Sequence, residues 1–310
     1  MIRRSVSAHI SGYLLKSIGV VLFVWILLRI DRVQLLFALH NASLPLILTG
    51  LGLLAPIYVL RSMRWHSLTT GSGVDESLLE ATHLYLASLF LGVVTPGKVG
   101  EAMRIPSLMR KGLTGRKSTA LTILDRGLDI ALLGPLGLAS VAFLSGTYPF
   151  LWWTGLAIAC GGGAYVLYRT TERWLTLPSD MVSLLKKTWM PVLGFTIVSW
   201  SLYYLQLIIF MRAFALEIPM IPFLSIMTVV GILSVLPIAP AGLGTREAAL
   251  LYFFRTFAIP PPLTIAFAFT IFITTFAGSL IGAYCLWRLP TGHAHRHIAR
   301  EPERVQSPHA

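Results

Sequence analysis

The chain has 310 residues, of which 55% are hydrophobic and only 12% are charged, and its mean hydropathy is +0.73. Soluble domains carry roughly 25% charged residues, so this composition excludes a soluble protein. The formal net charge of +12 does not indicate nucleic acid as a partner, because the cations stand in short blocks between apolar runs, as in membrane proteins. Cys160 and Cys285 both lie inside apolar runs, so we expect neither a disulfide framework nor a cysteine metal site.

Six apolar runs are long enough to cross the hydrocarbon core of a bilayer, which takes about 20 residues per helix. These predicted spans cover approximately residues 12–30, 44–60, 119–145, 149–168, 189–211 and 262–287. No cleavage site follows the first run, so we expect it to be retained in the membrane as a helix.

Two further apolar runs, 78–95 and 219–239, lead into clusters of proline and glycine. The first continues as TPGKVGE over residues 95–101, and the second includes PIAPAGLGTRE over residues 237–247. Both have a proline, two glycines and then a glutamate that opens a new helix. Matched interruptions of this kind are typical of internal repeats with broken helices. The alternative is that both are interfacial turns in which proline and glycine only stop the helix.

The distribution of the 25 Lys and Arg residues tests whether these two interrupted runs cross the bilayer. If both crossed, the basic block 98–118 would lie outside and the positive-inside rule would be inverted. If both are re-entrant, the blocks 98–118 and 169–188 lie inside, and the cations left outside are Arg29, Arg32, Arg212, Arg246 and Arg255. We therefore predict an all-α bundle with six spans and two re-entrant broken helices in an inverted repeat. We expect it in the cell inner (plasma) membrane, with both termini cytoplasmic.

The domain organisation follows from this pattern. We expect one transmembrane domain over residues 1–290, made of pseudo-repeats at about 1–145 and 146–290, and a disordered cytoplasmic tail over 291–310. The tail contains alternating histidines, for which disorder is favoured over a metal site, at positions His293, His295 and His297. We expect no cofactor. The two interrupted loops should line one central cavity, because bare peptide groups in lipid cost several kcal/mol.

Three charged residues, Asp125, Arg126 and Asp129, interrupt the apolar run 119–145. A charge at mid-bilayer costs about 2.5–3.5 kcal/mol on insertion scales, so these residues need partners. Arg126 can pair with Asp129 one turn away. Two acids and one base indicate a further cation, for which the candidates are Arg64, Lys98 and Arg104. The alternative is that the three residues lie near the cytoplasmic end and extend to water.

Residues 97–104 have the composition of a phosphate site. Gly97 and Gly100 would allow the backbone to approach a ligand, a helix N-terminus attracts anions, and Lys98 and Arg104 add positive charge. Glu101 would cap the new helix or pair with Arg104.

The span 189–211 carries two polar features of lesser weight. Gln206 lies among apolar residues and is expected to donate a hydrogen bond to another helix. Trp200, like the other tryptophans at the edges of apolar runs, is expected to anchor the chain at the membrane interface.

Four motifs together resemble a known family. They are RSMRW at 61–65, PGKVGE at 96–101 with Arg104, Arg126 with Asp129, and PAGLGTRE at 240–247. They resemble the flippase-like transmembrane region of lysylphosphatidylglycerol synthases, in a free-standing form without the soluble aminoacyl-transfer domain. The resemblance covers nearly the whole chain, although Ala241 stands where the family has a second glycine. It implies a lipid-binding or lipid-translocating bundle with re-entrant helices.

The residues expected to bind a lipid or its phosphate come from these motifs. They are Arg64, Pro96, Gly97, Lys98, Gly100, Glu101, Arg104, Arg126, Asp129, Gly242, Gly244, Arg246 and Glu247. In the working arrangement Arg104 holds the phosphate, while Glu101 and Glu247 orient arginines and open the re-entrant helices.

We expect a protein that is not an enzyme and that moves a lipid with a phosphate-containing headgroup, such as a phospholipid or a polyprenyl phosphate, between leaflets. One alternative is an integral membrane enzyme that modifies lipid headgroups, since the pair Asp125 and Asp129 could take part in such chemistry. Another is an accessory subunit in hopanoid or glycolipid biosynthesis, because free-standing relatives are linked to hopanoid and polyprenyl-lipid pathways. The expected partners are membrane lipids with anionic or phosphate headgroups, and a lipid-modifying enzyme is a further candidate.

Overall fold

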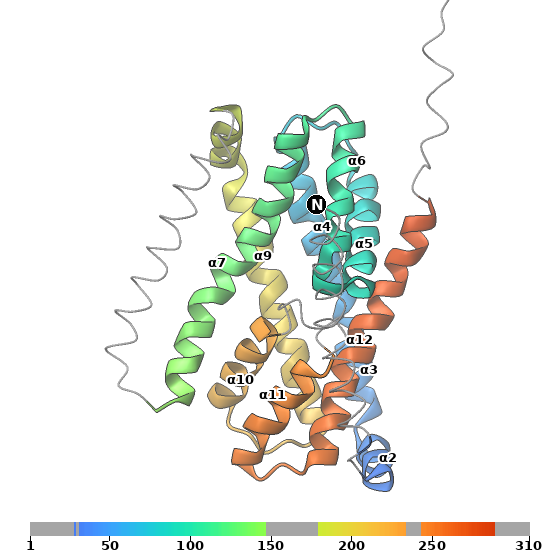
Figure 1. The fold of residues 1–310 in the computed structure, drawn as a ribbon, viewed down its shortest axis with the longest axis vertical. Coiled ribbons are helices and arrows are strands. Elements are labelled where there is room, and N and C mark those ends of the chain that lie inside the picture. Colours follow the sequence, from blue (N-terminus) through green and yellow to red (C-terminus); the bar gives the residue numbers. More distant parts are fainter. Residues whose placement is uncertain (1–27, 29–30, 147–178, 234–242, 289–310) are drawn as a thin grey trace, which may run out of the picture.

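The computed structural model describes residues 28, 31–146, 179–233 and 243–288, and in these residues every regular element is a helix (Figure 1). Four helical stretches are long and apolar enough to cross a membrane: Leu44–Gly71, Gly115–Leu144, Thr188–Ala213 and Pro261–Arg288. They correspond to four of the six predicted spans and confirm an all-α polytopic bundle. The predicted spans at 149–168 and, apart from Leu28, at 12–30 lie outside the described residues, as do residues 291–310 with their histidines.

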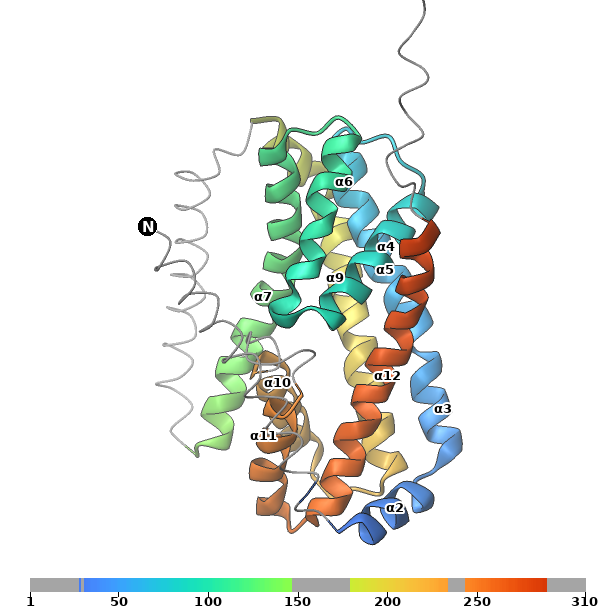
Figure 2. The same ribbon diagram turned by 45° about the vertical axis from the view of Figure 1, so that its right-hand side comes forward.

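The long helices form the frame of the bundle. They are α3 (Leu44–Gly52) with α4 (Leu54–Gly71), α7 (Gly115–Leu144), α9 (Ser179–Ala213) and α12 (Pro261–Arg288). The sequence analysis did not predict α2 (Arg32–Asn41), a short helix at the lower end of the bundle in Figures 1 and 2. Its start is fixed by Asp31, whose carboxylate accepts the N–H of Val33 at 2.8 Å, as an N-cap does.

The two interrupted runs form hairpins that enter the bundle from opposite ends (Figures 1 and 2). α5 (Leu78–Val94) descends from the upper end to mid-height, where η1 (Pro96–Met103) turns the chain and α6 (Arg104–Arg110) leads back. α10 (Met220–Leu233) rises from the lower end, and α11 (Thr245–Phe254) returns there before η3 (Arg255–Phe257). Within the described residues, both short apolar helices end at mid-height of the bundle, as the predicted re-entrant geometry requires.

Each re-entrant helix packs against the long helix that follows the other hairpin, α5 on α12 and α10 on α7. Glycines make both contacts close. A Cβ at Gly282 would overlap the carbonyl oxygen of Leu86, and a Cβ at Gly137 would overlap the side chain of Ile232. Small residues at such crossings let helix backbones approach closely inside a membrane. This reciprocal packing is the arrangement expected of an inverted repeat, whose boundaries at 1–145 and 146–290 stay a prediction.

Polar contacts fix the helices at two further points. Gln206 on α9 donates to the carbonyl oxygen of Gly50 on α3 at 2.6 Å, which confirms the predicted interhelical donor. At the upper end, the Lys111 ammonium lies 2.8 Å from Glu76 and 3.2 Å from Glu80. Burial alone would lower the pKa of Lys111, but hydrogen bonds and the negative charge of these two carboxylates raise it. This contact ties the start of α5 to the turn between α6 and α7.

Candidate functional site

The tip of the first hairpin is a tight turn in which glycine packs against the preceding helix. Gly100 donates its N–H to the hydroxyl of Thr95 at 2.7 Å. A Cβ at Gly100 would overlap the carbonyl oxygen of Leu91, so the position requires glycine for close backbone packing. The N–H of Gly100 is therefore already bonded inside the turn. This corrects the expectation that Gly100 lets the backbone approach a ligand.

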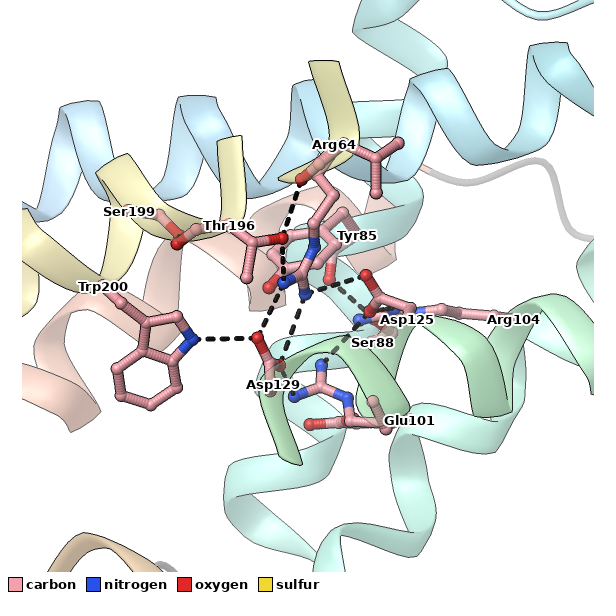
Figure 3. A network of polar contacts seen from close by, with 12 residues as sticks. Arg64, Tyr85, Ser88, Glu101, Arg104, Asp125, Asp129, Thr196, Ser199 and Trp200 are labelled. Atoms are coloured by element: carbon pink, nitrogen blue, oxygen red, sulfur yellow. Dashed lines mark hydrogen bonds and ion pairs between the residues drawn. The ribbon is translucent and has the colours of Figure 1, made fainter. Parts of the chain in front are cut away.

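The acidic residues of α7 are held by two arginines from other helices. Arg64 on α4 is fully buried, and its guanidinium lies 2.8 Å from Asp125 and 2.7 Å from Asp129. The second oxygen of Asp125 lies 2.7 Å from Nη1 of Arg104 on α6. Figure 3 shows the two aspartates on α7 facing these arginines. Arg64 and Arg104 are thus the missing cations, and the alternative in which Asp125 extends to water is wrong.

Arg104 is fully buried among side chains of α4, α5 and α7, and of its three nitrogens only Nη2 has no hydrogen-bond partner among the described residues. Its side chain is 0% exposed, its Nε donates to the Ser88 hydroxyl at 2.6 Å, and its guanidinium carbon lies 4.6 Å from the ring centroids of both Trp65 and Tyr85. Aromatic faces attract a desolvated guanidinium. An arginine held by a carboxylate, a hydroxyl and two rings is not free to hold a headgroup. Direct phosphate contact by Arg104 therefore does not fit this geometry.

Glu101 pairs with Arg126, whereas the sequence analysis offered helix capping or a pair with Arg104. Its carboxylate lies 2.7 Å from Nε of Arg126, whose other nitrogens lie 3.7 Å from Asp125 and 3.5 Å from Asp129. The space for Glu101 depends on Gly92, where a Cβ would lie 2.7 Å from the Glu101 side chain. Arg126 is 30% exposed while its partners are nearly buried. This pair therefore forms the edge of the network and joins η1 to α7.

The aromatic helix α9 closes the other side of the network. Nε1 of Trp200 donates to Asp129 at 3.0 Å, and the hydroxyl of Thr196 accepts from Arg64 at 3.4 Å (Figure 3). The interpretation of Trp200 as an interface anchor is wrong, because its indole binds a carboxylate inside the bundle. Its ring also lies 5.1 Å from the guanidinium carbon of Arg61.

The network is electrically neutral. It contains three arginines and three carboxylates, which are Arg64, Arg104 and Arg126 with Glu101, Asp125 and Asp129. Two more cations lie beside it. Lys98, at the tip of η1, is within electrostatic range of Arg126, Glu101, Arg61 and Asp129, and Arg61 also acts on Asp129. Among the described residues, neither Lys98 nor Arg61 has a carboxylate at ion-pair distance.

The second hairpin brings an internally paired arginine toward the same helix. The Glu247 carboxylate accepts the N–H of Gly244 at 2.6 Å and lies 2.7 Å from Arg246. Glu247 therefore opens α11 and orients Arg246, as predicted, whereas Gly242 lies outside the described residues. Tyr203 on α9 is within electrostatic range of both Arg246 and Arg61. Its neighbour Tyr204 shares a hydrogen bond of 2.7 Å with Thr228 of α10.

The sequence analysis missed several contacts of the site. Arg61, Trp65, Tyr85, Ser88 and Thr196 were not named as its members, although RSMRW at 61–65 contains two of them. The arginine and tryptophan of that motif were the available signal, because arginine with an aromatic ring is common around desolvated charges. Among the described residues no group of three or more His, Cys, Asp and Glu side chains gathers as a metal site.

Comparisons with known proteins agree with this architecture. No curated protein matches the chain significantly. The profile of one family, described as the lysylphosphatidylglycerol synthase TM region, matches residues 13–282. The match covers both hairpins and the whole buried network. The chain therefore belongs to the family of the lysylphosphatidylglycerol synthase transmembrane region.

Proposed function

We propose that this protein binds a lipid with a phosphate-containing headgroup and moves it between the two leaflets. The observation that carries the proposal is the pair of cations, Arg61 and Lys98, that lies beside a charge-neutral network at the tip of a re-entrant helix. Positive charge that has no carboxylate at ion-pair distance inside a membrane bundle is costly and marks substrate pathways. A phosphate group supplies the anion that these side chains lack.

The arrangement of the hairpins supports movement in addition to binding. η1 reaches mid-height from one end and the second hairpin approaches from the other (Figure 2). Broken helices that meet near the midplane are the usual setting of binding sites opened alternately to the two sides of a membrane. Tyr203 and Trp200, on the face of α9 between the two hairpins, would line the path of the headgroup.

A non-enzymatic role is part of the proposal. The acids that could catalyse headgroup chemistry, Asp125 and Asp129, are both held by Arg64. A carboxylate fixed between guanidinium groups is a poor general acid or base, because its charged form is strongly favoured.

We also propose a plasma-membrane location with cytoplasmic termini. The end of the bundle that holds the α6–α7 turn and the end of α12 (Figure 1) carries several exposed cations, among them Arg110, Arg116 and Arg288. Basic residues accumulate on the cytoplasmic side. Cysteines placed at Gly115 and Leu177 should be shielded from a thiol reagent added to intact cells, and strong labelling at Gly115 would contradict this orientation.

Purified full-length protein in proteoliposomes tests the function. Fluorescent phosphatidylglycerol placed in one leaflet should reach the other leaflet without chemical change. Recovery of a modified lipid would favour an enzyme. Neither movement nor turnover would favour an accessory subunit.

A further inference from the structure

The described part of the bundle contains two separate apolar cores, one around each hairpin. The upper core combines α4, α5 and α6 with the first half of α7, and Tyr85 and Leu121 are among its buried residues. The lower core combines α10 and α11 with the lower part of α9 and the first half of α12, and Phe223 and Phe254 are among its buried residues. Among the described residues, Tyr203 of α9 is the one side chain that packs against both cores. Closely packed interiors of this kind move as units.

We propose that the two cores rotate against each other about two joints, one in α7 at Gly134 and Pro135 and one between α3 and α4 at Gly52 and Leu53. Each core carries its own hairpin, so the rotation moves the first hairpin relative to the second. This inference rests on the proposed translocation, to which it adds the moving parts.

The helix α7 runs from the upper end of the bundle to the lower end (Figures 1 and 2) and contacts both cores. Its first half is fixed to the upper core, where Asp129 lies 2.7 Å from Arg64 of α4. Its second half is fixed to the lower core, because Leu144 packs against that core and Gly137 lies so close to Ile232 of α10 that a Cβ would overlap. A change in the angle between the cores must therefore be taken up between Asp129 and Gly137.

The stretch of α7 between these two contacts contains a glycine followed by a proline. Pro135 lies inside the helix and has no N–H to donate to the carbonyl oxygen of Ala131, and interior prolines kink or loosen a helix. A Cβ at Gly134 would meet no described atom within 4 Å. Ile130 and Leu136 on either side are exposed. Few packing contacts and a missing backbone hydrogen bond make this stretch the part of α7 that bends most easily.

The chain also crosses between the cores where α3 is followed by α4. Ile47 of α3 packs against the lower core, and Ile57 of α4 belongs to the upper core. α3 ends at Gly52 and α4 begins at Leu54, and a Cβ at Gly52 would meet no described atom within 4 Å. α9 and α12 also contact both cores, and neither has a proline between its two contacts. These two continuous helices limit the motion to a small rotation.

Distances between pairs of spin labels, measured by electron paramagnetic resonance on the full-length protein in lipid nanodiscs, test the joints. Labels are attached to cysteines at exposed positions in a chain without other cysteines. A pair at Leu79 and Arg116 lies within the upper part and should give one narrow distance. A pair at Arg116 and Tyr252 joins the upper part to the lower part and should give two distances.

Stiffening the joints should change the populations of these two distances. Pro135→Ala restores an N–H that can bond to the carbonyl oxygen of Ala131, so it should change the ratio of the two populations by about fivefold in favour of a straighter α7. Gly134→Ala and Gly52→Ala fit into open space and should act in the same direction, because alanine favours a helix over glycine. Movement of fluorescent phosphatidylglycerol should slow in all three variants.

Two matched controls should leave the populations unchanged. Gly127→Ala makes the same change in α7, again with no described atom within 4 Å of the new Cβ, but inside the half that is fixed to the upper core. Pro191→Ala removes an interior proline of α9 one position before Val192, the first described core residue of that helix. Bending at Pro191 therefore does not change the angle between the cores.

The outcomes separate this inference from the proposed function. Distances across the two parts that neither Pro135→Ala nor the glycine substitutions alter would overturn the joints, even if lipid movement were observed. Equal effects of Gly127→Ala and Gly134→Ala would also overturn them, because α7 would then be flexible along its whole length. Populations that shift only with the joint variants, in a protein that moves no lipid, would support the joints and contradict translocation.

Discussion

Substitution of Arg104 by Gln should destabilise the fold, because the side chain that was expected to hold the phosphate is part of a buried ion network. Arg104 is fully buried and lies 2.7 Å from Asp125. Removal of one partner from a buried ion pair costs about 3–5 kcal/mol. Asp125 keeps Arg64 at 2.8 Å, which reduces the loss, but the contacts of the guanidinium with Trp65 and Tyr85 are also lost, at about 0.5–2 kcal/mol. The expected destabilisation is therefore about 3–5 kcal/mol.

Unfolding of the purified full-length protein in detergent, followed by tryptophan fluorescence, measures this effect. The matched control is Arg116→Gln, which removes the same charge from an exposed position and should change stability by less than about 0.5 kcal/mol. The double variant Arg104→Gln with Asp125→Asn should lose less unfolding free energy than the two single variants lose together. The difference should be about 1 kcal/mol or more, because the two residues are in contact. If Arg104→Gln melted like Arg116→Gln, Arg104 would not be part of a buried network.

Three further substitutions test separate parts of the structure. Gly100→Ala places a Cβ against the carbonyl oxygen of Leu91 and should lower the unfolding free energy by about 1–3 kcal/mol; an unchanged melting temperature would contradict the packed turn. Glu247→Gln weakens the contact with Arg246 and should lower the unfolding free energy by about 1–3 kcal/mol. Hydrogen exchange should become faster at the start of α11 and stay unchanged in α5. Lys111→Met removes the partly exposed ion pairs with Glu76 and Glu80, so the unfolding free energy should fall by at most about 1 kcal/mol. Faster hydrogen exchange should be confined to residues 72–80. Folding raises the pKa of Lys111. Its contribution to the unfolding free energy is therefore complete below its unfolded pKa of about 10.4 and disappears as the pH rises through the folded value. A loss of the Lys111→Met effect near neutral pH would contradict this.

Four of the spans and the two short apolar helices could be predicted from the sequence because they depend on local properties. The length of an apolar run determines whether it can cross the membrane, and the position of the basic blocks determines on which side its ends lie. Both quantities can be read along the chain without knowledge of which helices touch. The run 44–60 was nevertheless placed too short, because α4 continues to Gly71 through Arg61 and the buried Arg64.

The partners within the site could be predicted only in part. The imbalance at Asp125 and Asp129 correctly indicated a missing cation, since charges at membrane depth require compensation. The pairing of each arginine with a particular carboxylate depends on how α4, α6 and α7 pack against one another. The spacing of these residues along the sequence does not contain that information. For Glu101 the sequence therefore offered only local roles, a helix cap or a pair with Arg104, whereas the structure pairs it with Arg126, 25 positions along the chain. The interpretation of Trp200 as an interface anchor failed for the same reason. Its position near the edge of an apolar run does not reveal that its indole donates to the carboxylate of Asp129.

The neutral network ties the tip of the first hairpin to three helices of the bundle. An ion network inside a bundle contributes little net stability compared with apolar packing, and its established use is to fix one arrangement among several. Here it connects η1, α6 and α7 with α4 through Arg64, Arg104 and Arg126. The re-entrant turn is thus held in register while Lys98 and Arg61 are left beside it.

The proposed translocation requires one headgroup site, at the tip of the first hairpin, that opens to both sides of the membrane. It is tested most directly by accessibility of position 98 in proteoliposomes of uniform orientation, with Lys98→Cys in a chain in which Cys160 and Cys285 are replaced by Ser. A membrane-impermeant thiol reagent should modify this cysteine when added to either side, whereas a cysteine at Gly115 should react from one side only. Reaction of position 98 from a single side, with no reaction from the other over the time of lipid movement, would contradict the account.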